Sequence, residues 1–490
     1  MSRSLPRIYA LAAAAFIAAY FLYFTVGSLR TEFTHDDLMN CYRAWFHTLP
    51  DLLTDNLLFF RFSPTFRPFG ALVYKASFAL FGFDLFPLRV LLLLVLGANI
   101  FLTYKLCRAL TGSTEMGLFG ALALAYHMKL WPLYYTTGTL YDLFCFLFYF
   151  SALTFYIQKR QEGRELNLSA LVVVCVLYIL ALNSKEAAVS FPVMLLLYEL
   201  LWHPPFLTKP ALMNWFSRQA LAAWVASAIT AAYIAGRVFF PTFGLGNVTA
   251  YQATISVNEY LSKAAFYFGE LFYTSTWFDS RITLLILLSL LFVSAVSFSR
   301  TLLFGSLLFM VGILPLAFIP ARVLSAVYLP LAGFSICAAV LLGFLLNALI
   351  RISERQTWPP AAFLVVFLAT GFLLIRMHHT VEHIYVAFLT EYSQVRETRE
   401  QLAQLYPEMA PGSRILILKT PFPQYTPGYQ TLFLIRLLYN DVSLTVDELA
   451  RLQENHAITD LASYDCVLSY EEGRLVDVDP AALTSDATGL

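Results

Sequence analysis

The sequence predicts a mainly α-helical, polytopic membrane protein with about eleven transmembrane helices, amphipathic helices in the outer loops and a small C-terminal α/β domain. Composition is the first reason: 59% of the 490 residues are hydrophobic and 13% are charged, whereas soluble domains carry about 25% charged residues. The second is a series of long apolar runs, and the third is a change to soluble composition near residue 377. We therefore expect a membrane domain over residues 1–376 and a second domain over residues 377–490.

Each predicted transmembrane helix is an apolar run, and about 20 such residues are needed to cross the hydrocarbon core. The first run follows Arg3 and Arg7 in the manner of a signal peptide, but its apolar stretch is longer than the h-region of a typical signal peptide and no convincing cleavage site follows. We expect it to remain as an anchor. The candidate runs are residues 8–29, 86–106, 114–130, 140–157, 168–184, 187–202, 220–240, 282–299, 301–319, 323–350 and 359–376.

Basic residues in short loops predict the orientation, because cytoplasmic loops are enriched in Lys and Arg. With these runs, the denser basic loops fall on the side of the N-terminus, which we expect to be cytoplasmic. An odd number of spans then places the C-terminal domain in the periplasm, with the chain in a bacterial inner membrane. The basic residues on the predicted cytoplasmic side are Arg3, Arg7, Lys159, Arg160, Arg164, Lys209, Arg218, Arg351 and Arg355.

Charge balance and cysteine content exclude other classes of protein. The 32 Lys and Arg equal the 32 Asp and Glu, so the chain lacks the net positive charge of a nucleic-acid-binding protein. Membrane lipids are the expected partners instead. Six cysteines are too few for a disulfide framework, and whether Cys41 and Cys466 pair is left open. The sequence contains no internal repeat, and in particular no tetratricopeptide pattern.

Two long outer loops, about residues 30–85 and 241–281, each have the spacing of an amphipathic helix lying at the membrane surface. In the second loop, Glu259 and Lys263 form an i,i+4 pair in the favourable order. The first helix carries an apolar face of Leu38, Tyr42, Trp45 and Leu49 and a polar face of Asp36, Asn40, Arg43 and His47. The second carries a polar stripe of Glu259, Lys263, Tyr267, Glu270 and Thr274 opposite Leu261, Ala264, Phe268 and Leu271.

The C-terminal region alternates helical and strand patterns, which predicts a small α/β domain. We expect helices over Glu391–Leu405 and Thr431–Tyr439, with a Pro-rich loop over Pro421–Gly428. The predicted strands are Arg414–Lys419, Val442–Val446, Asp465–Tyr470 and Arg474–Val478.

An acidic pair, Asp36 and Asp37, follows Thr34 and His35 just after the first predicted span. An Asp at this point can simply cap a helix, since its carboxylate accepts the unpaired N–H groups of the first turn. Two adjacent carboxylates exceed what capping needs, and one beside an apolar face could have its pKa raised toward that of a general base. Capping is the more frequent role of such residues, and catalysis is the alternative.

Other ionisable residues lie near the predicted membrane surface, where charge is costly and often functional. Arg67 could bind lipid head groups, or it could donate two hydrogen bonds to a phosphate. Lys185 could neutralise Glu186 at a helix end, or act as a point charge on a phosphate with Glu186 orienting it. Arg322 before Tyr328 could snorkel to the interface. The fourth span contains Asp142 after four polar or small residues, with no partner identified by the sequence.

A histidine cluster lies where the chain leaves the membrane. His379 and His383 are one helical turn apart, with His378 and Glu382 beside them. This spacing suits a metal, but the complete zincin signature is absent. An ordinary interfacial helix face is favoured over a metal site.

The order of these motifs resembles the GT-C superfamily of membrane glycosyltransferases. Protein O-mannosyltransferases, bacterial aminoarabinose transferases and the O-mannosyltransferases with transmembrane and tetratricopeptide repeats are similar over about residues 1–350. The last branch is the most similar, although the spacing from Arg322 to Tyr328 is longer here and the repeats are missing. The resemblance rests on Asp36-Asp37, Phe66-Arg67-Pro68, Ser184-Lys185-Glu186 and Tyr328-Leu329-Pro330.

This resemblance implies transfer of a sugar from a polyprenyl-phosphate donor to an acceptor protein, lipid or glycan on the noncytoplasmic face, with inversion at the sugar. It implies that Asp36 is the general base, assisted by Asp37. Arg67, Lys185 and Arg322 would then bind the donor phosphate and stabilise its growing charge. Asp142, Glu186 and Tyr328 would support the site, with no metal ligand assigned and a divalent metal left as an open alternative.

Two other functions compete with this interpretation. Many spans and dispersed charges are also typical of a transporter or lipid flippase, although the sequence lacks the repeated halves common in transporters. A noncatalytic scaffold that binds an envelope partner through the C-terminal domain is the third hypothesis. Under this hypothesis, Asp36, Arg67 and Lys185 would not lie close together in the structure.

Overall fold

The computed structural model describes residues 5–60, 67–125, 128–163, 166–205, 208–239, 254–274, 277–352, 359–381, 383–422, 429–454 and 463–479. The chain divides into two compact units. The first comprises Met1–Leu29, Pro50–Gly70 and Leu88–His383, and the second comprises Arg30–Leu49, Ala71–Pro87 and Ile384–Leu490. The helix after the first span thus groups with the C-terminal region.

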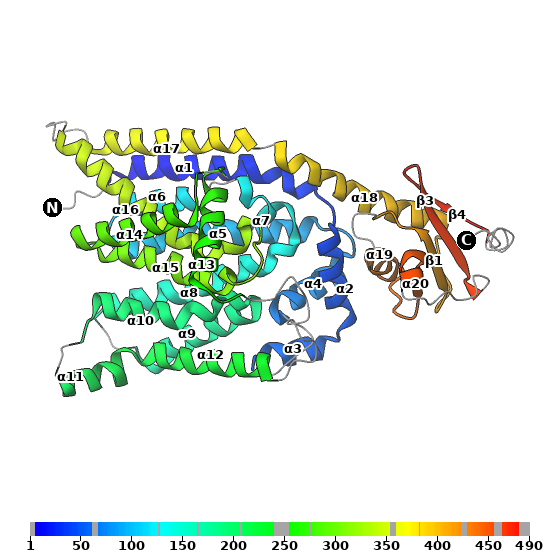
Figure 1. The fold of residues 1–490 in the computed structure, drawn as a ribbon, viewed down its shortest axis with the longest axis horizontal. Coiled ribbons are helices and arrows are strands. Elements are labelled where there is room, and N and C mark those ends of the chain that lie inside the picture. The colour runs from blue at the N-terminus through cyan, green and yellow to red at the C-terminus, as the bar shows by residue number, and fades with distance from the viewer. Residues whose placement is uncertain are drawn as a thin grey trace. The chain divides into compact units, whose positions relative to one another are not determined.

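The first unit is built from helices (Figure 1). Most of its helices are rich in Leu, Ala and Phe on all sides, as expected of segments buried in protein and lipid. The α-helices that lie in it wholly or in part are α1 (Arg7–Thr25), α3 (Leu49–Leu57), α4 (Pro68–Phe81), α5 (Phe86–Thr111), α6 (Thr114–Ala125), α7 (Pro132–Tyr135), α8 (Leu140–Gln161), α9 (Leu168–Ser184), α10 (Phe191–Trp202), α11 (Lys209–Asn214), α12 (Leu221–Phe239), α13 (Val257–Leu271), α14 (Ser280–Val296), α15 (Arg300–Ala317), α16 (Tyr328–Ile352) and α17 (Pro359–Val381).

The apolar helices make this chain an integral membrane protein. Among the described residues, 6 helices are long and apolar enough to cross a bilayer, and a bent pair, Lys209–Gln219 with Leu221–Gly236, brings the number to 7. Shorter apolar helices include α4, α6, α9 and α14. Every predicted run contains a helix, but the predicted number of spans is not confirmed, because several of these helices have 10–17 residues.

Small residues allow close helix packing inside the first unit. A Cβ atom at Gly333 of α16 would lie 2.6 Å from the carbonyl oxygen of Gly305 in α15, and one at Gly120 of α6 would lie 2.4 Å from Cys107 Sγ in α5. Close backbone approach at small residues favours helix association in membranes, where burial of apolar surface supplies little driving force. α15 therefore packs tightly against α16, and α5 against α6.

The second unit is organised around a four-stranded sheet in the order β2-β1-β3-β4. Its strands are β1 (Arg414–Lys419), β2 (Thr445–Glu448), β3 (Cys466–Glu471) and β4 (Arg474–Asp477). The strand β1 is parallel to both β2 and β3, while β3 and β4 are antiparallel. The helices α18 (His383–Leu405), α19 (Gln430–Leu438) and α20 (Leu449–Glu454) complete the α/β fold. α2 (His35–Phe46) belongs to the same unit.

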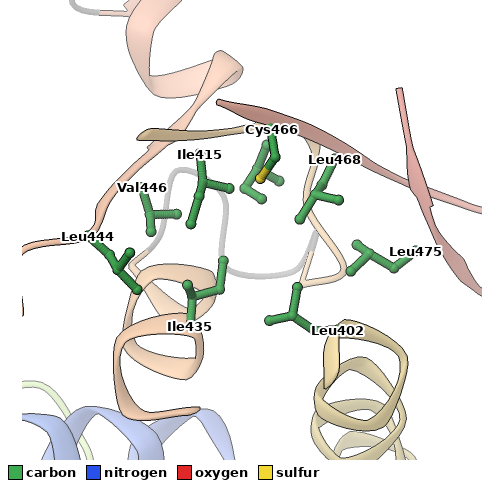
Figure 2. Close-up of a cluster of buried hydrophobic side chains, with 9 residues drawn as sticks. Leu402, Ile415, Ile435, Leu444, Val446, Cys466, Leu468 and Leu475 are labelled. Atoms are coloured by element: carbon green, nitrogen blue, oxygen red, sulfur yellow. The ribbon is translucent and has the colours of Figure 1, made fainter. Parts of the chain in front are cut away.

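The apolar core of this sheet lies between its strands and two helices. In Figure 2 the side chains from β1, β2 and β3 point toward Ile435 of α19 and Leu402 of α18. Successive side chains of a strand point to opposite faces of a sheet, so each strand presents one face to these helices. The core consists of Leu402, Ile415, Ile417, Ile435, Leu444, Val446, Cys466, Leu468 and Leu475.

The C-terminal elements follow the sequence prediction with shifted ends. The strand Arg414–Lys419 has the predicted bounds, while the strand expected at Val442–Val446 occupies Thr445–Glu448. The helix α20 was not predicted. Residues 423–428 of the expected Pro-rich loop lie outside the described residues. Cys41 and Cys466 are both free thiols with buried side chains.

The predicted outer-loop helices are present as α2 and α13. α2 ends at Phe46, before Leu49, so the predicted apolar face is divided between α2 and α3. In α13 the Lys263 ammonium lies 2.6 Å from the Glu259 carboxylate, as the i,i+4 spacing predicted. Tyr267 of the predicted polar stripe is buried, and its hydroxyl accepts a hydrogen bond from the Arg322 backbone N–H.

Candidate active site

Four charged side chains meet in the first unit and form what we call the charge cluster: Arg67, Asp142, Lys185 and Glu186. The Arg67 Nη2 donates to Glu186 Oε1 at 2.7 Å, and its Nε donates to Glu186 Oε2 at 3.1 Å. This is a bidentate pair, whose planar geometry fixes both side chains. Lys185 Nζ donates to Asp142 Oδ1, which supplies the partner that the sequence did not identify for this acid.

The pairing within the charge cluster differs from the one considered for the sequence. Lys185 and Glu186 are neighbours in the chain, but each binds a partner from another segment. Their opposite charges still interact, as do those of Asp142 and Arg67. Two cations and two anions therefore alternate, and the cluster is neutral as a whole.

Electrostatics keep the Arg67–Glu186 pair ionised. Burial by itself raises the pKa of Glu186, but the Arg67 guanidinium and Lys185 outweigh burial and lower this pKa to about 2. For Arg67, burial lowers the pKa while Glu186 and Asp142 raise it, and the net effect is a raised pKa. Both groups are consequently charged across the physiological pH range.

Helix ends position the members of the charge cluster. Asp142 lies in the first turn of α8, where the helix dipole favours a negative charge. The Thr136 hydroxyl accepts from the Gly138 N–H at 2.9 Å, which fixes the turn that precedes α8. Lys185 has extended backbone angles (φ −160°, ψ 141°) that end α9 and turn its side chain away from the helix.

Arg67 is also held against an aromatic ring. Its guanidinium carbon lies 5.1 Å from the centroid of the Tyr141 ring, within cation–π range. Tyr141 also explains Gly70, because a Cβ there would lie 2.2 Å from the tyrosine ring. Tyr141 is not among the site residues predicted from the sequence, although its position next to Asp142 was a signal for it.

The acidic pair of α2 belongs to the second unit, and its two members have different surroundings. Thr34 and Asp37 form a capping box: Thr34 Oγ1 accepts from the Asp37 N–H at 3.2 Å, and Asp37 Oδ2 accepts from the Thr34 N–H at 3.1 Å. Asp37 is fully buried, whereas the Asp36 side chain is 61% exposed and lies 3.4 Å from His35 Nε2. Capping therefore accounts for Asp37, and Asp36 is the accessible carboxylate.

The two remaining predicted residues lie near the start of α16. Arg322 is half-buried and donates its backbone N–H to Tyr267 at 3.3 Å. Tyr328 is buried, with its ring centroid 4.6 Å from that of Phe146 in α8. Tyr328 thus packs between α8 and α16, and no contact of the Arg322 side chain with the charge cluster is seen among the described residues.

The histidine cluster is embedded in aromatic contacts. His378 is buried, stacks on Phe24 with centroids 3.5 Å apart, and shares a hydrogen bond of 3.3 Å with the Tyr20 hydroxyl. Glu382 and the His383 side chain lie outside the described residues. Within the described ranges, no three His, Cys, Asp or Glu side chains are grouped so as to hold a metal ion.

A second buried ion pair was missed in the sequence. Arg160 of α8 donates from Nε and Nη2 to the Glu199 carboxylate of α10 at 2.7 and 2.8 Å, and the Tyr156 hydroxyl donates to it at 2.7 Å. The sequence predicts Arg160 as a charge of a cytoplasmic connection, but the residue lies in the last turn of α8 and its side chain is buried. The buried pair with Glu199 therefore weakens the prediction of orientation from that connection.

Comparison with known proteins relates this arrangement to membrane glycosyltransferases. A sequence profile of the dolichyl-phosphate-mannose-protein mannosyltransferases matches residues 64–231, which include the whole charge cluster. No curated protein matches the sequence significantly. ArnT from Cupriavidus metallidurans in the apo state shares the fold over 97% of this chain and 94% of its own, at 12% identity and a TM-score of 0.50.

The structure of the same ArnT bound to undecaprenyl phosphate gives a TM-score of 0.52, with the same identity and coverage. The profile match and the similarity of the fold to that of ArnT support the GT-C resemblance predicted from the order of the motifs.

Proposed function

We propose that this protein is a GT-C glycosyltransferase that transfers a sugar from a polyprenyl-phosphate donor to an acceptor hydroxyl or amine. The observation that carries the proposal is the charge cluster. In it, carboxylates hold the cations of Arg67 and Lys185 in place, and all its members lie within the matched residues 64–231. The binding of undecaprenyl phosphate by ArnT, which has the same fold, supports a lipid-phosphate donor here. A bacterial inner membrane and a noncytoplasmic reaction face complete the proposal.

The phosphate of the donor binds to Arg67 and Lys185 in this mechanism. Arg67 offers a planar fork of N–H donors and Lys185 a compact ammonium, which together suit a phosphate. As the bond between the sugar and the phosphate oxygen breaks, negative charge grows on the leaving phosphate. Cations already oriented by Glu186 and Asp142 stabilise that charge without reorganising, which favours the transition state. The GT-C resemblance adds Arg322 to the proposed phosphate site, although no contact of its side chain seen among the described residues supports this assignment.

Asp36 acts as the general base. Its exposed carboxylate takes the proton of the acceptor O–H or N–H while the acceptor atom attacks the anomeric carbon. The carbon–oxygen bond to the phosphate breaks, and its electron pair leaves with the polyprenyl phosphate. Attack from the side opposite the leaving group inverts the configuration at the sugar. Asp37 supports Asp36 by capping α2.

Sugar transfer from a labelled polyprenyl-phosphate donor by the purified protein tests this proposal. The wild type is expected to give a covalent labelled product, and Asp36→Asn is expected to lose turnover because Asn cannot accept the proton. Thr34→Ser, which keeps the hydroxyl that caps α2, is the matched control. Equal turnover by Asp36→Asn and the wild type would remove Asp36 from the mechanism.

A further inference from the structure

The helix that carries Asp36 is fastened to the C-terminal α/β fold. The rings of Tyr42 in α2 and Phe433 in α19 are stacked, with centroids 4.7 Å apart and planes at 28°. Arg436 of α19 donates from Nη1 to the Tyr42 hydroxyl at 2.7 Å. An aromatic stack and a charge-assisted hydrogen bond thus join the same two helices.

A second hydrogen bond lies one turn further along α2. Trp45 Nε1 donates to Asn440 Oδ1 at 2.8 Å. Asn440 follows the end of α19 in the left-handed region (φ 50°), a conformation that Asn and Gly adopt most readily. At the end of α2, the Lys75 ammonium from α4 donates to the Trp45 carbonyl oxygen at 3.0 Å.

On the other side of this attachment, α19 is joined to the sheet by a hydrogen bond and by core packing. Arg436 donates from Nε to the Leu444 carbonyl oxygen at 2.8 Å, just before β2. Ile435, its neighbour on α19, is buried in the sheet core. A continuous set of packed groups therefore runs from the sheet through α19 to α2.

The helix α2 needs such support, because it has 12 residues and helices this short are marginal in isolation. Its first turn is fixed by the Thr34–Asp37 capping box, which sets where the helix begins but not how it is rotated. Tyr42 and Trp45 lie on the two turns after Asp36 and bind partners outside the helix. Their contacts fix the rotation of α2, and with it the direction of the Asp36 side chain.

We propose that Tyr42, Arg436, Trp45 and Asn440 are positioning residues through which the C-terminal domain orients the Asp36 carboxylate. This inference rests on the proposed function, in which Asp36 is the general base. It assigns the C-terminal domain a direct part in turnover, in addition to any contact with the acceptor.

The test compares turnover by full-length protein carrying Tyr42→Phe together with Asn440→Gly. The first change removes one hydroxyl, and the second keeps a residue that adopts the left-handed conformation. Turnover is expected to fall about 10-fold with little change in the KM of the donor, since small errors in the position of a catalytic group cost up to about 100-fold. Tyr464→Phe, which removes a tyrosine hydrogen bond to Asp447 in the same domain, is the matched control and is expected to keep wild-type turnover.

The same pair of changes is then placed on the Asp36→Asn background. A role exercised through Asp36 predicts no further loss of the residual activity, because the group being oriented is already disabled. A loss of equal factor on both backgrounds would show a merely structural effect and overturn the inference. Wild-type turnover by the double variant would also overturn it. Full activity of Asp36→Asn alone would instead contradict the proposed function, so the two failures are distinguishable.

Discussion

Arg67 and Glu186 lie 119 positions apart in the chain and are joined by two hydrogen bonds, at 2.7 and 3.1 Å. The pair connects the residue that precedes α4 with the turn that follows α9. It also places a guanidinium beside Lys185, the neighbour of Glu186, although like charges repel. The Asp142 carboxylate offsets this repulsion by accepting from Lys185. Two cations can therefore stay close together before any phosphate binds.

Replacing Arg67 is expected to lower turnover strongly. Arg67→Ala removes the planar donor and is expected to lower kcat about 100-fold, the cost typical of losing one oxyanion donor. Arg67→Lys keeps the charge but cannot form the bidentate pair with Glu186, so an intermediate loss is expected. Steady-state kinetics with a labelled donor measure both. Lys159→Ala, which removes a cation paired with the exposed Glu162, is the control. Wild-type kcat in Arg67→Ala would exclude Arg67 from the phosphate site.

Substitutions of Lys185 and Asp142 are expected to affect stability and turnover differently. Asp142→Asn leaves the Lys185 ammonium buried without its counter-charge, and breaking such a pair typically costs about 3 kcal/mol in the free energy of unfolding. The double variant Asp142→Leu with Lys185→Met removes both charges and is expected to unfold at a higher temperature than Asp142→Asn. It is nevertheless expected to be inactive. Thermal unfolding in detergent and turnover, measured on the same preparations, check both points; an active double variant would contradict the role of Lys185.

Of the two acids of α2, Asp37 is expected to affect stability and Asp36 is expected to affect turnover. Asp37→Ala removes the reciprocal hydrogen bond of the capping box and is expected to cost about 1 kcal/mol in the free energy of unfolding. Asp36→Asn is expected to leave stability unchanged, because its side chain is exposed, while lowering turnover to a small residual activity. Unfolding curves and kinetics for both variants test this division. The reverse pattern, with a stable inactive Asp37→Ala and a destabilised Asp36→Asn, would refute it.

Glu186 predicts a specific pH dependence of stability. Its pKa is lowered in the folded protein from its ordinary value of 4.5 to about 2. A lowered folded-state pKa means that the pair contributes fully above the ordinary value and that this contribution is lost as the pH falls toward 2. The stability advantage of the wild type over Glu186→Gln is therefore expected to be constant above about pH 6 and to shrink below about pH 4. Thermal unfolding across this range measures it, with Glu162→Gln as the exposed control. An advantage that does not change with pH would contradict the ionised pair.

Much of the secondary structure could be predicted from local sequence patterns. The short, continuous apolar run in Arg414–Lys419 and the longer apolar runs elsewhere were sufficient to predict a strand and the helices. The spacing of Thr34 and Asp37 also contained the capping box. Helix length was harder to predict, because an apolar run can continue past the end of a helix, as the run over residues 114–130 does beyond α6, which ends at Ala125.

Partners that are distant in the chain could not be predicted. Lys185 and Asp142 are 43 positions apart, and their contact depends on how α8 packs against α9. The sequence predicts Arg160 as a loop charge, because its counter-charge, Glu199, is 39 positions away in the apolar run 187–202 and no local pattern joins the two. The grouping of α2 with the C-terminal region also follows from contacts such as that of Tyr42 with Phe433, which no local pattern encodes.

Sugar transfer in sealed vesicles tests the central claim most directly. Purified protein is reconstituted with a polyprenyl-phosphate donor labelled in both the sugar and the phosphate, and the products are analysed by mass spectrometry. The account predicts that sugar joins the acceptor and that an equal amount of polyprenyl phosphate is released, with both amounts reduced in Arg67→Ala and Asp36→Asn. Movement of the intact labelled donor across the bilayer without any covalent product would contradict it and would favour a flippase.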